Sequence, residues 1–176
     1  MIERIWAPWR AQYIRESGTD SGREVPCFLC RSLSERKDRE NLVVWRGGHS
    51  VVVLNRFPYN NGHLLVAPLV HRGTLQELEG DDLHEPIETV RWMMGILDQM
   101  LRPQGYNVGL NQGKAAGAGL PGHLHWHVVP RWDGDTNFMP ILGNAKVIVE
   151  SLLEFYDRLV EAAVPTPASP GDGPRP

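Results

Sequence analysis

The chain lacks several features that would place it in a special class of protein. No apolar run in its 176 residues approaches the roughly 20 residues that a membrane-spanning helix needs. The N-terminal segment lacks the charged start, apolar centre and small-residue cleavage site of a secretory signal. A net charge of -3 argues against a broad nucleic-acid surface, although a small anionic ligand remains compatible with it. We therefore expect one cytoplasmic protein that has neither a membrane nor a nucleic acid as its partner.

Cysteine is scarce, because the chain contains only Cys27 and Cys30, in the sequence PCFLC. In a reducing compartment this spacing favours a metal site or a redox pair over a structural disulfide. A thioredoxin-like pair opens a helix within a strand-helix-strand unit, whereas this pair follows the polar loop ESGTDSGREVP. The sequence thus favours a metal site, provided that further ligands exist elsewhere in the chain.

The apolar pattern predicts an α+β domain built on an antiparallel sheet. Short β-branched runs predict strands at residues 42–46, 50–55, 63–67, 106–111 and 123–129. Helical spacing of apolar residues predicts one long helix at 81–101 and a C-terminal helix at 149–163. We expect a single domain over residues 1–163, with an N-terminal extension at 1–40 that contains the cysteine pair. The tail at 164–176 is rich in proline and glycine, and we expect it to be disordered.

Three histidines occupy alternate positions in the segment GHLHWHVVPRW, namely His123, His125 and His127. On a β-strand, which rises about 3.3 Å per residue, alternate side chains share one face and lie about 6.6 Å apart. The residues between them are apolar and predict a buried opposite face. Three readings remain at this point: a solvated strand face, a metal site and nucleophilic catalysis.

The loop just before these histidines has the sequence NQGKAAGAGLPG and contains four glycines and three alanines. Its backbone amides can therefore approach a ligand closely. Such a loop suits a phosphate group, whose oxygens accept N–H bonds, better than it suits a bare metal ion. A glycine-rich loop is a weak signal alone, and its position beside the histidines makes it informative.

The segment HLHWHVV resembles the signature of the histidine triad superfamily, whose members are nucleotide hydrolases and transferases. Residues 51–68 are similar to the other half of that family's site, and NVGLNQGKAAGAG to its phosphate loop. The segments RIWAPWR and HVVPRWDGDTNFMP are similar to the bacterial and mycobacterial branch that includes diadenosine tetraphosphate phosphorylases and hydrolases. The resemblance covers most of residues 4–149. It implies a HIT-like fold and a homodimer that joins two five-stranded sheets.

The resemblance also implies roles for individual residues. His125 would attack the α-phosphorus and form a covalent nucleotidyl-imidazole, His127 would contact phosphate oxygens, and His63 would lie beside them. The implied nucleotide contacts are Asn55 at the ribose and Asn111, Gly117, Ala118 and Gly119 at the phosphates. Many members carry Gln and Ser or Thr where this chain has Ala118, Gly119 and Leu120, so we expect the backbone to bind phosphate here. The implied substrate is a purine nucleotide or dinucleoside polyphosphate, and the chemistry needs no cofactor.

Some bacterial triad proteins and the related galactose-1-phosphate uridylyltransferases bind zinc through a comparable cysteine pair. The resemblance implies a structural zinc site formed by Cys27, Cys30, His71 and His123. His49 is a rival for the third ligand. Two other functions remain open: a catalytically weak nucleotide-binding or partner-binding protein, and a metalloenzyme that uses the triad as its metal site. The latter requires an acidic base, and the nearest candidates, Asp133 and Asp135, lie past the end of the strand.

Overall fold

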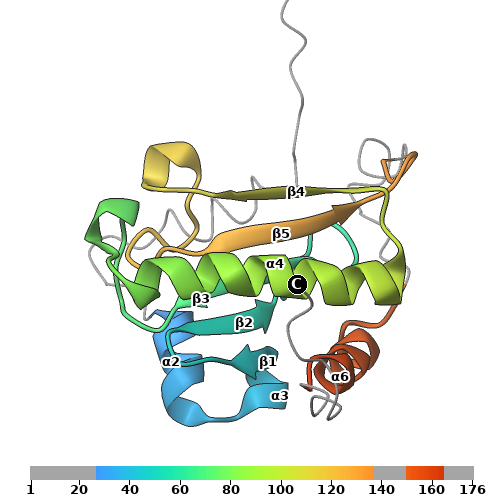
Figure 1. Ribbon diagram of the computed structural model, residues 1–176, viewed down its shortest axis with the longest axis horizontal. Coiled ribbons are helices and arrows are strands. Elements are labelled where there is room, and N and C mark those ends of the chain that lie inside the picture. Colours follow the sequence, from blue (N-terminus) through green and yellow to red (C-terminus); the bar gives the residue numbers. More distant parts are fainter. Residues whose placement is uncertain (1–26, 137–149, 165–176) are drawn as a thin grey trace, which may run out of the picture.

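The structure, a computed structural model, describes residues 27–136 and 150–164 (Figure 1). The first 26 residues of the expected N-terminal extension and the expected disordered tail from residue 165 lie outside the described residues. Among the described residues, no helix is long and apolar enough to cross a bilayer.

The described part of the chain is built on one five-stranded antiparallel sheet, as predicted. Its strands are β1 (Val43–Arg46), β2 (Ser50–Leu54), β3 (Leu64–Pro68), β4 (Gly105–Leu110) and β5 (Trp126–Arg131). They lie in the order β1-β2-β3-β5-β4, so that β5 is inserted between β3 and β4. Strands β3 and β5, which are far apart in sequence, are therefore neighbours in the sheet.

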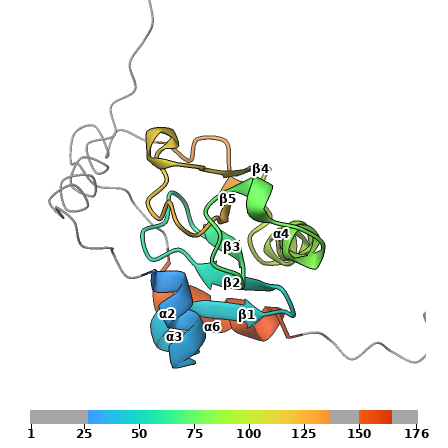
Figure 2. The same cartoon turned by 90° about the vertical axis from the view of Figure 1, so that its left-hand side faces the viewer.

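The helices cover one face and one edge of this sheet. The long helix α4 (Asp81–Leu101) has the predicted bounds and packs on β2, β3 and β5. Helices α2 (Phe28–Glu35), α3 (Asp38–Asn41) and α6 (Leu152–Ala162) lie at the β1 end, and short 3-10 turns occur at η1 (Leu75–Glu77) and η2 (Lys114–Ala116). Figure 2 shows α4 against one face of the sheet and α2, α3 and α6 grouped around β1.

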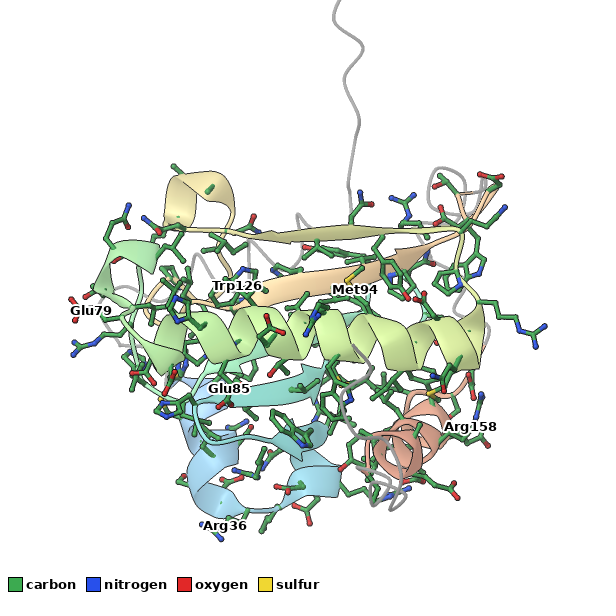
Figure 3. All side chains as sticks on the ribbon, in the orientation of Figure 1. Arg36, Glu79, Glu85, Met94, Trp126 and Arg158 are labelled. Atoms are coloured by element: carbon green, nitrogen blue, oxygen red, sulfur yellow. The ribbon has the colours of Figure 1, made fainter. Side chains whose placement is uncertain are left out.

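The two faces of β5 have different environments. Side chains alternate across a strand, and Pro130 lies with Leu97 and Leu101 of α4 around Gly62. Trp126 and Val128 therefore face α4, where Trp126 is buried in the core against which Met94 packs (Figure 3). His127 points to the opposite face, which α4 does not cover.

One prediction about local structure was wrong. Strand β5 begins at Trp126 and not at residue 123, because Pro68 offers no N–H for further pairing and its carbonyl accepts a bond from the His123 ring. The cysteine pair opens helix α2, because the Cys27 side chain caps this helix by accepting from the Cys30 amide. This helix leads into α3 and not into a strand, so the context still differs from that of a thioredoxin-like pair.

Candidate active site and metal centre

The three histidines of the 123–127 segment do not share one face, contrary to the strand geometry that the alternation predicted. His127 lies on β5, half-buried, whereas His125 and His123 lie in the unpaired segment before it and are buried. The His125 and His127 rings remain neighbours, with centroids 5.0 Å apart. His123 turns away from them, toward Pro68 and the cysteines. The histidines thus separate into a pair and a single residue.

His125 is held in one tautomer by its backbone partner. Its Nδ1 lies 2.9 Å from the carbonyl oxygen of His123, which can only accept, so Nδ1 carries the proton. The lone pair of the neutral ring then lies on Nε2, on the other side of the imidazole. Burial lowers the pKa of His125 below its ordinary value, which favours this neutral form at pH 7. Such a ring is suited to nucleophilic attack.

His63 and His127 form a second hydrogen-bonded unit. The amide of Tyr59, which can only donate, lies 3.0 Å from His63 Nδ1, so this nitrogen accepts. His63 Nε2 then carries a proton and donates to His127 Nδ1 at 3.0 Å. In the neutral His127 ring the remaining proton must lie on Nε2, which points away from His63. His127 therefore carries an N–H on a ring whose centroid lies 5.0 Å from that of His125.

Asn55 lies beside the hydrogen-bonded pair of His63 and His127, immediately after β2. Its Oδ1 accepts from the amide of Phe57 at 3.0 Å, so its Nδ2 is turned toward His63, 3.2 Å from Nδ1. The structure thus brings His63, Asn55, His125 and His127 together.

The loop that the sequence predicts to bind phosphate lies on the β4 side of His127. Asn111 Nδ2 reaches the Gly117 carbonyl at 3.5 Å. In this conformation the amides of Gly117 and Ala118 donate within the loop, to the carbonyls of Lys114 at 2.9 Å and Gly113 at 3.2 Å. Phosphate binding by these two amides would therefore require the loop to rearrange.

A cavity of about 340 Å³ opens on the face of the sheet opposite α4. It lies over β4 and β5, next to η2 and the turn that precedes β3, and its lining includes Tyr59, Asn107, Gly109, Asn111 and His127. Pockets that enclose a drug-sized ligand have volumes of about 300 to 1,000 Å³. This cavity is near the lower limit, so it can hold only part of a larger ligand.

The cysteine pair forms a second cluster with His71 and His123, in which the four ligand atoms lie within 4.8 Å of one another. His123 Nδ1 lies 3.3 Å from Cys27 Sγ and 3.5 Å from Cys30 Sγ, and His71 Nδ1 lies 3.2 Å from Cys30 Sγ. Tetrahedral zinc with ordinary bond lengths separates a sulfur and a nitrogen ligand by about 3.6 Å. The donor set and the spacing therefore fit a closed zinc site.

The protonation of this cluster is consistent with such a site. His123 Nε2 lies 2.9 Å from the Pro68 carbonyl and must donate to it, which leaves the Nδ1 lone pair facing the sulfurs. Burial lowers the pKa of His123, which keeps the ring neutral. Burial and the neighbouring Cys27 side chain raise the pKa of the Cys30 thiol to about 11, so metal binding must displace that proton.

His49, the rival ligand, lies at a different place. It is in the turn between β1 and β2, where its Nδ1 is 2.8 Å from Asp82 and its amide donates to Glu85 of α4. The carboxylate at Asp82 raises the pKa of His49. His49 therefore joins the turn to the N-terminus of α4, and His71 takes the third position at the cysteines.

The fold and site geometry can be compared with known proteins. A model of the HIT domain matches residues 36–134, which include the sheet, α4 and all three histidines. The chain belongs to the HIT, or histidine triad, family. An AP-4-A phosphorylase of Mycobacterium tuberculosis is 38% identical over 154 residues, which cover 86% of this chain and 79% of that protein.

Solved HIT structures share the fold. A histidine triad nucleotide-binding protein from Sulfolobus tokodaii aligns with a TM-score of 0.61 at 26% identity, covering 77% of this chain and 88% of that one. A zinc-bound histidine triad family protein from Mycobacterium smegmatis aligns with a TM-score of 0.63 at 23% identity, covering 78% and 92% of the two chains.

Tyr59 is a residue of this HIT site that the sequence did not reveal. Its ring is stacked on His127, with centroids 6.1 Å apart, and lies 4.8 Å from the His63 centroid. Its amide fixes the His63 tautomer. In the sequence Tyr59 belongs to the turn FPYNNG. The only feature that could have indicated a role in the site is an aromatic side chain among turn residues.

Proposed function

We propose that this HIT protein cleaves dinucleoside polyphosphates at the α-phosphorus, with His125 as the nucleophile. The relation to nucleotide-cleaving family members, an AP-4-A phosphorylase and a bis(5'-nucleosyl)-tetraphosphatase of Schizosaccharomyces pombe, supports a nucleotide-cleaving enzyme. The observation that carries the finer proposal is the His125 Nδ1 bond to the His123 carbonyl, because it leaves the lone pair on Nε2 of a ring whose centroid lies 5.0 Å from that of His127.

The proposed reaction proceeds in two displacements. His125 Nε2 forms a bond to the α-phosphorus while the bond to the bridging oxygen breaks, and the departing polyphosphate carries away that electron pair. The N–H of His127 stabilises the oxygen that leaves, and its Nδ1 bond to His63 holds it in place. Water or orthophosphate then displaces the imidazole, which releases AMP or ADP respectively. Asn55 and the loop at Asn111 and Gly119 would bind the ribose and the phosphates.

We further propose a structural zinc ion at Cys27, Cys30, His71 and His123. These residues come from α2, from the loop after β3 and from the segment before β5. A metal ion would join these three segments and leave no open position for substrate. Because the His123 carbonyl accepts from His125 Nδ1, the same ion would also fix the backbone that orients the nucleophile.

The other two functions have less support from the geometry. A metalloenzyme at the triad needs an acidic base there, yet Asp135 is bound by Arg131 and Asn60, and Asp133 pairs with Gln104. A catalytically weak binding protein would not need the fixed tautomers at His125 and His127.

The experiment uses diadenosine tetraphosphate labelled at the α-phosphate, with and without orthophosphate. Acid-free trapping should yield one labelled adduct per chain in the wild type and none in His125→Ala. Turnover should fall by about 10⁴-fold or more in that variant, as for loss of other catalytic nucleophiles. AMP as product indicates a hydrolase, and ADP formed only with orthophosphate indicates a phosphorylase.

The matched control is His84→Ala, because His84 is an exposed histidine on α4 away from the cluster. It should retain both adduct formation and turnover. A wild-type protein that neither forms an adduct nor cleaves the nucleotide would refute the enzymatic proposal, and full turnover by His125→Ala would refute the assigned nucleophile.

A further inference from the structure

The strand order arranges the candidate site as a row across one end of the sheet. Asn55 follows β2, His63 precedes β3, His127 lies on β5, and Gly109 lies directly opposite His127 on β4. Asn55 contacts His63, and His63 donates to His127. A substrate whose ribose meets Asn55 and whose α-phosphorus lies at the His125 and His127 pair must therefore continue over β4.

The cavity lies at that end of the row, and we call it the β4 hollow. Residues opposite each other on antiparallel strands point to the same face, so Gly109, paired with His127, and Asn107, paired with Val129, lie on the face opposite α4. Tyr59 forms an aromatic wall of the hollow. The Arg131 guanidinium bonds Asn107 Oδ1, which orients the Nδ2 donors away from that arginine.

The chemistry of the β4 hollow suits an uncharged aromatic group better than it suits phosphate. Among the described residues that line it there is no lysine, arginine or carboxylate. His127 and Asn111, which the proposed reaction assigns to the phosphates, form part of the lining, and the rest combines the Tyr59 ring, the Asn107 amide and apolar residues. A nucleobase stacks on such a ring and accepts or donates bonds to side-chain amides. The volume of about 340 Å³ fits one part of a ligand and not a whole dinucleotide.

We propose that the β4 hollow binds the nucleoside of the departing half of the substrate, and that Gly109 and Tyr59 set the size of the accepted leaving group. This inference rests on the proposed function and extends it. A Cβ atom at Gly109 would meet no atom within 4 Å, so the absent side chain leaves open space next to His127. A larger residue there would fill the space without any backbone conflict, because Gly109 is not among the glycines with positive φ.

The test compares two substrates with the same adenylyl half. Diadenosine tetraphosphate releases a whole nucleotide, whereas adenosine 5'-phosphoramidate releases only ammonia. In Gly109→Val the ratio of kcat/KM for the first substrate to that for the second should fall about tenfold or more, as overpacking of a ligand site predicts. In Tyr59→Leu the ratio should fall at least about fivefold, mainly through KM for the dinucleotide, because a base has lost its stacking partner.

The matched control is Gly105→Val. Gly105 lies on the same face of β4, also has open space at its Cβ position and does not line the hollow. Its ratio should stay within about twofold of the wild type, since a β-branched residue is tolerated in a strand. An unchanged ratio in Gly109→Val, or an equal fall in Gly105→Val, would overturn this inference while the proposed function stands. A wild type inactive on both substrates would overturn both.

Discussion

Each imidazole of the candidate site has a partner that fixes its tautomer. The His123 and Pro68 carbonyls can only accept and the Tyr59 amide can only donate, so the protons on His125, His123 and His63 are assigned by backbone groups. Three chemically identical side chains thereby obtain different tasks. The sequence supplies the residue type, and the neighbouring backbone determines which nitrogen is reactive.

Asp135 supports the same site from the end of β5. Its carboxylate accepts from the Arg131 guanidinium and, at 2.8 Å, from Asn60 Nδ2, and Asn60 also donates to the Pro130 carbonyl. Asn60 lies in the turn that carries Tyr59 and His63. The Asp135 side chain is only 7% exposed, whereas that of Arg131 is 44% exposed, so the carboxylate is shielded from water more than its arginine partner is.

We predict that Asp135→Asn lowers the free energy of unfolding by about 2 kcal/mol at pH 7, because a charged acceptor of several bonds is lost. The Arg131 bond holds the pKa of Asp135 well below its usual range. A lowered folded-state pKa means that its stabilisation is complete above the unfolded value of about 3.9 and is lost as pH falls further. The melting-temperature difference between wild type and variant should therefore be largest near pH 7 and shrink below about pH 4. A constant difference across this range would contradict the assignment.

At the scale of elements, the turn between β2 and β3 positions half of the site. Gly62 has a φ of +74° in this turn, and a Cβ there would lie 2.7 Å from Leu101 Cδ1 of α4. The turn can thus pack closely on α4 and place His63 at the start of β3. Glycine is required here for both its conformation and its size.

We predict that Gly62→Ala lowers the free energy of unfolding by about 1 to 2 kcal/mol, through backbone strain and crowding against Leu101. The matched control is Gly95→Ala, at an exposed position within α4 where a Cβ meets nothing within 4 Å. It should raise stability by up to about 1 kcal/mol, because alanine is the better helix former. Urea unfolding of both variants measures these effects, and equal shifts would show that the Gly62 conformation is unimportant.

At the scale of the whole molecule, the cluster of two cysteines and two histidines joins parts of the chain that are far apart in sequence. Cys27 and His123 are separated by 96 positions, yet Cys27 Sγ lies 3.3 Å from His123 Nδ1. The cluster connects α2, at the β1 end, with the segment that leads into β5. A metal ion would therefore stabilise the fold and the catalytic backbone together.

We predict that purified wild-type protein holds about one zinc ion per chain, and that Cys27→Ser holds less than about a tenth of that and melts at a lower temperature. The matched control is His49→Gln, which removes the rival ligand and should leave the zinc content unchanged. Metal analysis by mass spectrometry and thermal unfolding give the two readouts. Equal zinc content in Cys27→Ser and wild type would refute the site.

The expected homodimer stays a prediction that no contact in the single chain tests. The single-domain boundary at residue 163 also stays a prediction, and sedimentation of the full chain would measure the assembly.

Sequence by itself determined the elements and the residue types of this protein. Period-two and helical patterns are local, so they predicted five strands and α4, and the spaced histidines with Asn55 pointed to the family. Only the tertiary structure decided the separation of His123 from His125 and His127. That separation depends on Pro68, which ends the pairing of β3 with β5. The Pro68 carbonyl oxygen also accepts a hydrogen bond from the His123 ring. The Tyr59 stacking and the opening at Gly109 arise because β5 lies between β3 and β4, an arrangement set by long-range packing and not by local pattern.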